Sequence, residues 1–261
     1  MFIVPDLSFS LFSLFNVKPY GLMLVVGLWL FSWHFIASGS RQLALSRSEL
    51  LDIIFVGLLA GVLGGRLFYL LESGFLSCGD LICGLSSGGL SVLGAIIAVP
   101  LALYGYAWAK KISFLNLMDQ ICLHAPLLDM YGRIGCFFAG CCFGLEWDGF
   151  FSIAYQFESS GQLVGVPLFP IQLVAALLFS VMWSFFVGFD RVFRQKPSGS
   201  MFMLYLFCAS LIRFVLDFWR GDRPEIFLWG CTKYQFLGLG IMLFSGTFLI
   251  YLFVSAKKRS S

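Results

Sequence analysis

Long apolar stretches alternate with short polar connections along most of this chain. Seven of the stretches are long enough to cross a membrane, because about 20 helical residues span the hydrocarbon core of a bilayer. The predicted helices lie near 20–38, 50–71, 89–109, 117–140, 168–189, 199–219 and 230–255. The connections are rich in Ser, Gly, Pro and Lys, which are typical of turns. The pattern predicts an all-α integral membrane protein with residues 1–261 in a single membrane domain.

Composition supports this class and narrows it. The chain is 59% hydrophobic and only 12% charged, whereas about a quarter of the residues in a soluble domain are charged. Residues 1–19 lack the basic region and cleavage site of a secretory signal, so we expect an interfacial N-terminal arm there. The basic residues are scattered rather than gathered into a patch, so no nucleic-acid partner is expected.

The basic residues of the loops predict the orientation of the helices. With the N-terminus outside, the inner side receives Arg41, Arg47, Lys110, Lys111, Arg191, Arg194, Lys196, Lys257, Lys258 and Arg259. The outer side receives Lys18, Arg220, Arg223 and Lys233. Because Lys and Arg favour the cytoplasmic side, this asymmetry predicts an outer N-terminus and an inner C-terminus.

Three arginines, Arg66, Arg133 and Arg213, fall inside the apolar stretches instead. Each costs roughly 2.5–3.5 kcal/mol at the centre of a membrane helix, so each requires a partner or a function. One explanation is snorkelling or pairing with a buried acid, and the candidate acids are Asp52, Asp129 and Asp217. Because three separate helices carry these arginines, we favour one anion-binding cavity that opens to the outer leaflet.

The stretch 199–219 strengthens the case for an anion site. Arg213, Asp217 and Arg220 follow one another at i, i+4 and i+7, so they share one helical face. Asp217 neutralises one of the two arginines and leaves net positive charge. A guanidinium group holds a phosphate through two parallel hydrogen bonds, which makes a lipid phosphate a suitable ligand.

Two glycine-rich motifs accompany the other arginines. In GRIGCFFAGCCFG (132–144), a continuous helix would place one set of residues on a single face. That set is Arg133, Cys136, Gly140, Cys141 and Gly144, with Gly132 and Gly135 beside it. In GGR (64–66), Gly64 and Gly65 favour close helix packing, which does not explain Arg66.

Taken in order, these motifs resemble those of the prolipoprotein diacylglyceryl transferases. The matching elements are YGLM at Tyr20, GGR at 64–66, the glycine–arginine signature at 132–144, FPIQL with Pro170 and Gln172, the set Arg213, Asp217 and Arg220, and YQFLG with Gln235. Each motif alone is weak. Their order along seven helices, from residue 20 to about 240, is specific.

The resemblance implies a membrane enzyme that moves the diacylglyceryl group of phosphatidylglycerol to the cysteine thiol of a prolipoprotein or related acceptor. It implies a site on the outer, periplasmic side of the bacterial inner membrane, and it implies no cofactor or metal. Arg133 and Arg213 would stabilise charge on the leaving phosphate. The implied substrate-binding residues are Tyr20, Gly64, Gly65, Arg66, Gly132, Gly135, Gly144, Gln172, Asp217, Arg220 and Gln235.

The chain also departs from the family pattern. Leu93 stands where the family has a histidine, and leucine cannot accept the proton of the attacking thiol. The other departures are Cys136 and Cys141 for asparagine and glutamate, Ala209 for tyrosine, and Val174 and Ala175 for a tyrosine–glutamate pair. The cavity for a lipid phosphate is therefore retained while much of its polar lining is replaced.

Several groups could replace the missing base. His124 is favoured as a buried histidine whose hydrogen bonds are satisfied, and His34 lies toward the inner end of its helix. A cysteine near an arginine can have a lowered pKa and act as base or nucleophile. Cys136 and Cys141 are therefore the candidate catalytic thiols.

Two other functions compete with the transferase. Cys78, Cys83, Cys141, Cys142 and Cys231 fall near the outer side, where a Cys78–Cys83 disulfide or a membrane thiol oxidoreductase is conceivable. Such an oxidoreductase usually carries a C-x-x-C pair, which this chain lacks. Zinc is disfavoured because acidic and histidine ligands are lacking nearby. The second competitor is a catalytically inactive relative that binds anionic lipid.

Overall fold

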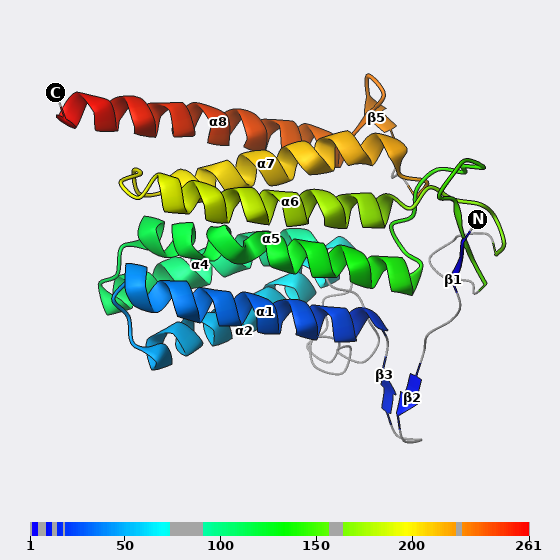
Figure 1. Ribbon diagram of the computed structural model, residues 1–261, viewed down its shortest axis with the longest axis horizontal. Helices are drawn as coiled ribbons and strands as arrows, with labels where there is room; N and C mark the ends of the chain where they lie inside the picture. Colours follow the sequence, from blue (N-terminus) through cyan, green and yellow to red (C-terminus); the bar gives the residue numbers. More distant parts are fainter. Residues whose placement is uncertain are drawn as a thin grey trace. The chain divides into compact units, whose positions relative to one another are not determined.

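The computed structural model describes residues 2–4, 9–11, 15–17, 19–73, 91–156, 164–222 and 226–260. Within these ranges the chain forms seven α-helices (Figure 1). They are α1 (Pro19–Gln42), α2 (Arg47–Ser73), α4 (Val92–Lys110), α5 (Phe114–Ala139), α6 (Ile171–Val192), α7 (Ser200–Leu216) and α8 (Lys233–Ser260). Every predicted range overlaps one of these helices, so the all-α prediction is confirmed.

Six of the seven helices are long and apolar enough to cross a membrane. The exception is α5, which has 26 residues and contains the charged side chains Asp119, Asp129 and Arg133. The protein is therefore a multi-pass membrane protein, and the helix that carries the glycine–arginine motif is the one outside these six. The two compact units of the chain comprise residues 1–34 with 121–261, and residues 35–120.

In the unit formed by residues 35–120, α2 packs along α4. The two backbones approach so closely that a Cβ atom on Gly94 would lie 2.2 Å from the carbonyl oxygen of Gly64. A capping box begins α2: the backbone N–H of Ser46 donates to Glu49 at 2.9 Å, and the backbone N–H of Glu49 donates to the Ser46 hydroxyl at 3.3 Å. Small residues thus allow α2 and α4 to pack closely, and the capping box satisfies backbone N–H groups at the start of α2.

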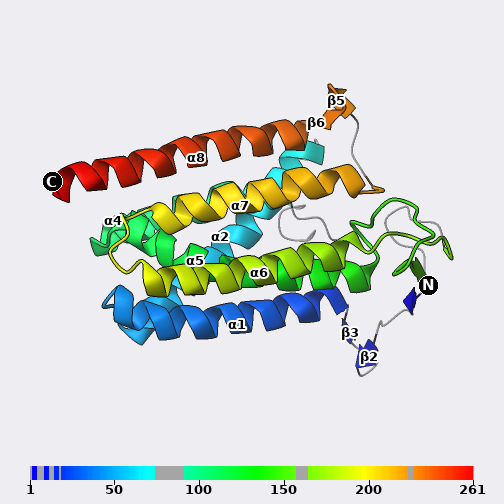
Figure 2. The same cartoon turned by 45° about the horizontal axis from the view of Figure 1, so that its top comes forward.

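In the unit formed by residues 1–34 and 121–261, α7 packs along both α6 and α8 (Figure 2). Apolar side chains from α5, α6 and α7 make its main core. Its buried members are Leu123, Phe179, Met182, Phe186 and Met201. This core holds α5 beside α7, which is the arrangement that positions the site.

A small cap covers one end of this unit. Strand β1 (Phe2–Val4) pairs in parallel with β4 (Ile153–Tyr155). The second apolar core lies beneath this pair and comprises Val4, Phe143, Ile153, Tyr155 and Leu168. Two antiparallel pairs complete the strands that the structure describes: β2 (Phe9–Leu11) with β3 (Phe15–Val17), and β5 (Ile226–Leu228) with β6 (Cys231–Thr232). The predicted N-terminal arm therefore contains short strands.

Candidate active site

Two arginines on neighbouring helices share one acidic neighbour. Arg133 of α5 and Arg213 of α7 both lie within electrostatic range of the Asp129 carboxylate and of each other. The hydroxyl of Tyr205 donates a hydrogen bond to Asp129 Oδ2 at 2.8 Å. Neither guanidinium group forms a hydrogen bond or ion pair with any residue that the structure describes. The two cations therefore remain available to an anionic ligand.

The sequence did not reveal the roles of Asp129 and Tyr205 in this site. Asp129 was one of three candidate partners for the intramembrane arginines, and Tyr205 was not considered. Tyr205 lies one helical turn before Ala209, where the related family has its tyrosine, so a phenol is present on α7 at a shifted position. The spacing of Asp129 and Arg133, one turn apart on α5, was the available signal.

The helix α5 ends at Ala139, before the predicted helical face of residues 133–144 is complete. Gly140 takes a positive φ of 66°, which glycine adopts at little cost. The backbone N–H of Cys141 donates to the carbonyl of Cys136 at 3.2 Å, and that of Gly140 donates to Phe137 at 3.3 Å. This is the hydrogen-bond pattern of a Schellman motif. The prediction that Cys141 and Gly144 continue the Arg133 face of a helix was therefore wrong.

The chain reversal nevertheless brings three thiols together. The Sγ atoms of Cys136, Cys141 and Cys142 all lie within 4.8 Å of one another. Cys142 has a positive φ of 54°, a conformation that costs a non-glycine residue about 1–2 kcal/mol. The pKa of the Cys142 thiol is lowered, chiefly by interaction with the neighbouring side chains of Cys136 and Cys141 and further by Arg220 and Arg133, which stabilise its thiolate. From the sequence, Cys136 and Cys141 were the candidate catalytic thiols, whereas Cys142 was named only among the cysteines near the outer side.

Gln172 fixes the segment that carries these thiols. It lies in the first turn of α6 and is buried, and its Nε2 donates to the carbonyl of Cys141 at 3.0 Å and to the Tyr155 hydroxyl at 3.2 Å. The Tyr155 hydroxyl in turn donates to the carbonyl of Phe137 at 3.0 Å. The amide nitrogen of this predicted substrate-binding residue thus orients the end of α5.

Gly144 is positioned by close contacts between backbones. A Cβ atom there would lie 2.4 Å from the carbonyl oxygen of Phe169, and a Cβ atom on Gly221 would lie 2.4 Å from the carbonyl oxygen of Gly144. The backbone N–H of Gly221 donates to Phe143 at 2.9 Å. Glycine is therefore required at 144 for packing, whether or not this residue also contacts substrate.

The acidic partners of Arg220 lie close to it. Its Nε and Nη2 each donate to Asp222 at 2.9 Å, and its Nη1 lies 4.0 Å from Asp217. Burial lowers the pKa of Arg220, but its hydrogen bonds and charge interactions with Asp222 outweigh that effect and raise it overall. Asp217 also accepts a hydrogen bond from Thr232 Oγ1 at 3.1 Å. The predicted face of Arg213, Asp217 and Arg220 is thus divided, with Arg220 paired and Arg213 available.

Gln235 helps to cap the start of α8. Its Oε1 accepts the backbone N–H of Thr232 at 2.9 Å, and its own backbone N–H donates to Thr232 Oγ1 at 3.2 Å. These reciprocal bonds form a capping box at the start of α8. Its Nε2 also donates to the carbonyl of Phe214 at 3.2 Å, which ties α8 to α7. These bonds account for the glutamine without a substrate.

Tyr20 and Gly135 lie against each other at the start of α1 and the end of α5. A Cβ atom on Gly135 would be 3.0 Å from Cδ2 of Tyr20, so this glycine allows the ring to approach α5. Tyr20 is also within electrostatic range of the three thiols and Arg133. The structure therefore brings Tyr20 into the same site. Gly132 has open space where its Cβ would lie.

The remaining predicted residues belong to residues 35–120. Gly65 is buried, and its carbonyl accepts the backbone N–H of Ser91 at 2.9 Å. Arg66 is only 6% exposed, and its guanidinium carbon lies 5.4 Å from the centre of the Tyr69 ring. That Arg66 joins Arg133 and Arg213 in one cavity remains a prediction, as does the consequence of Leu93.

The two histidines lie together within the helical bundle. His124 Nδ1 accepts a hydrogen bond from Trp183 Nε1 at 3.3 Å, and its ring stacks on His34 with centroids 5.6 Å apart. His124 is therefore a buried, hydrogen-bonded histidine, as expected. The proposed Cys78–Cys83 disulfide lies outside the described residues.

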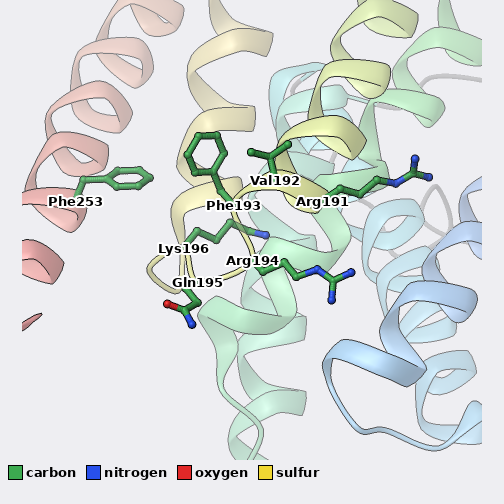
Figure 3. A pocket seen from close by; sticks show the side chains of 7 residues that line it. All are labelled: Arg191, Val192, Phe193, Arg194, Gln195, Lys196 and Phe253. Carbon is green, nitrogen blue, oxygen red and sulfur yellow. The ribbon is translucent and has the colours of Figure 1, made fainter.

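A hollow of about 430 Å³ lies at the opposite end of α6 from Gln172. Figure 3 shows Phe253 of α8 facing it on one side, while Arg191 and Arg194 extend on the other. Lys196, which also lines the hollow, forms an ion pair with Asp190. The 22 residues of α6 rise about 33 Å, so this hollow is far from the thiols.

The sequences of known proteins identify the family. The family model for prolipoprotein diacylglyceryl transferase matches residues 7–251. The phosphatidylglycerol–prolipoprotein diacylglyceryl transferase of Geobacter sulfurreducens is 34% identical over 214 residues, which cover 79% of this chain and 79% of that protein. The protein of the same name from Dehalococcoides mccartyi is 27% identical over 252 residues, or 95% and 94% of the two chains. This chain therefore belongs to the prolipoprotein diacylglyceryl transferase family.

Proposed function

We propose that this protein transfers the diacylglyceryl group of phosphatidylglycerol to the cysteine thiol of a prolipoprotein. The observation that carries the proposal is the pair of guanidinium groups, Arg133 and Arg213, beside one carboxylate. The names of the relatives agree with it, because they specify both of these substrates. Two arginines that form no hydrogen bond or ion pair with the described residues favour a phosphate ligand, because the guanidinium group matches phosphate oxygens in geometry and charge.

The charges of the site suit a phospholipid. Two guanidinium groups and the Asp129 carboxylate sum to one positive charge, which balances the single negative charge of a phosphodiester. The hydroxyl of Tyr205 holds the carboxylate in place at 2.8 Å. During transfer the leaving glycerol phosphate gains a second negative charge. Donors already oriented toward that phosphate stabilise the transition state more than the ground state.

The reaction forms one bond and breaks one. The thiolate sulfur of the acceptor attacks the carbon of the diacylglyceryl group that carries the phosphate ester, and a thioether bond forms. The bond between this carbon and the ester oxygen breaks, and its electron pair leaves on glycerol phosphate. Arg133 and Arg213 are the groups that we assign to this phosphate. The thiol proton must be removed before the attack, because the thiolate is the nucleophile.

We also propose that the site faces the outer side of the bacterial inner membrane. The end of α6 that lies far from the thiols has Arg191 in its last turn and Arg194 and Lys196 just beyond it, and α8 ends near Lys257 and Lys258. Basic residues favour the cytoplasmic side. This distribution supports an inner position for that end and an outer position for the opposite end, where α5 meets the cap.

A transfer reaction with purified protein tests the proposal. The full chain in detergent micelles containing phosphatidylglycerol is incubated with a lipoprotein signal peptide that contains one cysteine. A peptide with serine in place of this cysteine is the control. We expect the mass of the cysteine peptide alone to increase by one diacylglyceryl group. Binding of the lipid without any mass gain would instead support an inactive lipid-binding relative.

A further inference from the structure

The three thiols at the end of α5 form a cluster that has no role in the transfer steps described above. Cys136, Cys141 and Cys142 are half-buried, and none of them is in a disulfide. Their Sγ atoms all lie within 4.8 Å of one another. Among the residues that the structure describes, no other group of three metal-ligating side chains converges in this way.

This spacing suits a single metal ion. Zinc–sulfur bonds are about 2.3 Å long, so three thiolates around one zinc ion lie about 3.8–4.0 Å apart. The observed Sγ atoms lie within 4.8 Å of one another, so small side-chain movements are enough to reach the separations that zinc requires. Thiolates are soft ligands that bind zinc strongly. The sequence disfavoured zinc because carboxylates and imidazoles were lacking, but a set of cysteine thiolates requires neither.

The backbone is shaped to hold the cluster. The Schellman motif at Gly140 reverses the chain, so that Cys141 returns toward Cys136. Cys142 adopts a positive φ of 54°, although glycine is the residue that takes such a conformation easily. Gln172 holds the carbonyl of Cys141 at 3.0 Å. A strained residue in a segment fixed on both sides is typical of a functional site.

The surrounding charges favour a bound metal thiolate. One zinc ion with three thiolates carries one negative charge. Cys142 lies within electrostatic range of both Arg220 and Arg133. Arg220 is already paired with Asp222, so Arg133 is the cation that offsets this negative charge. Because Arg133 also belongs to the proposed phosphate site, the cluster lies next to the place where the acceptor thiol must react.

We propose that Cys136, Cys141 and Cys142 bind one zinc ion and leave its fourth position open to the acceptor thiol. Catalytic zinc sites commonly have three protein ligands and one open position. The role of the open position rests on the proposed transferase function. The metal would perform the task for which the related family has a histidine where this chain has Leu93.

The proposed step balances without a redox partner. The acceptor thiol coordinates zinc as a thiolate and releases its proton to water, because a thiol bound to zinc is deprotonated. The thiolate sulfur then attacks the diacylglyceryl carbon, and the electron pair of the broken carbon–oxygen bond leaves on glycerol phosphate. The thioether product binds zinc weakly and dissociates. Zinc stays divalent throughout.

A cobalt titration tests the metal site directly. The reduced full-length protein in detergent is titrated with Co²⁺, whose thiolate complexes absorb in the near ultraviolet and whose tetrahedral complexes absorb in the visible range. We expect saturation at one equivalent and displacement by Zn²⁺. Cys136→Ser, Cys141→Ser and Cys142→Ser should each weaken binding more than ~100-fold, since even outer-shell changes cost 10–100-fold. Cys208→Ser on α7 is the matched control and should bind like the parent.

Circular dichroism and gel filtration establish that each serine variant is folded. A second measurement uses the parent protein. Bound Zn²⁺ should prevent a maleimide from modifying Cys136, Cys141 and Cys142, and it should not change the modification of Cys208. Absence of cobalt binding, binding that survives loss of any one of the three thiols, or a disulfide that forms in place of binding would overturn the proposal.

The cobalt-loaded protein then tests the open position. The cysteine peptide should strengthen the thiolate absorption, and the serine peptide should leave it unchanged. Loss of this response would overturn the role of the open position. Transfer that continues in a chelator-treated, metal-free sample would refute the zinc role and uphold the transferase. A cobalt site that accepts the peptide thiol without any transfer would uphold the metal site and refute the proposed transfer reaction.

Discussion

Replacement of Arg133 with lysine separates a requirement for charge from a requirement for the guanidinium fork. Lysine retains the positive charge beside Asp129 and has nearly the same helix propensity as arginine. Arg133 forms no hydrogen bond or ion pair with the described residues, so no such contact within that part of the protein is lost. We therefore expect Arg133→Lys to insert and fold like the parent.

The expected loss of activity follows from one missing hydrogen bond. A guanidinium group holds a phosphate through two parallel bonds, whereas an ammonium group acts as a point charge. A hydrogen bond to a charged group contributes about 1.5–3 kcal/mol. Since 1.36 kcal/mol is a factor of ten in rate, kcat/KM for phosphatidylglycerol should fall about 10- to 150-fold.

The assay measures kcat/KM for the cysteine peptide reaction together with the affinity of the purified variant for phosphatidylglycerol vesicles. Arg191→Lys, at the far end of α6, makes the same chemical change outside the site and should match the parent. A kcat/KM and lipid affinity for Arg133→Lys within about twofold of the parent, or less than ~0.5 kcal/mol, would refute the bidentate phosphate contact.

Three further predictions address packing, capping and the thiols. Gly94→Leu should destabilise the α2–α4 pair by ~3 kcal/mol or more and lower the thermal midpoint, because its Cβ would lie 2.2 Å from a carbonyl oxygen, whereas Gly105→Ala, in open space, should not. Gln235→Ala should cost about 1 kcal/mol of stability without changing KM for the lipid; a raised KM alone would restore a substrate role. Cys141→Ser should abolish transfer, measured by peptide mass, while Cys208→Ser retains it; parent-level turnover in Cys141→Ser would reduce this thiol to a packing residue.

The helices were predictable because length and hydropathy alone determine which segments can span a bilayer. The predicted range 168–189 and the observed Ile171–Val192 differ by three residues at each end. The end of α5 was harder, because it depends on one glycine, Gly140, in a motif that contains several others. A helix continued through Gly140 produced the wrong face for Cys141.

The candidate site was predictable where a residue type is expensive in a membrane. A charged arginine in an apolar helix requires an explanation, and this argument located Arg133 and Arg213. Gln235 has a structural role in its capping box that the sequence did not indicate, and its role in substrate binding stays a prediction. The convergence of Cys142 with Cys136 and Cys141 was not predictable, because the approach of three sulfur atoms depends on a chain reversal rather than on helical spacing.

The most direct measurement of the central claim is the joint yield of both products from one reaction. The parent protein is incubated with phosphatidylglycerol and the cysteine peptide, and released glycerol phosphate is quantified beside the modified peptide. Transfer predicts that one glycerol phosphate appears for every diacylglyceryl group gained by the peptide, and that neither appears with the serine peptide. Glycerol phosphate released without peptide modification, or no product of either kind, would contradict the claim.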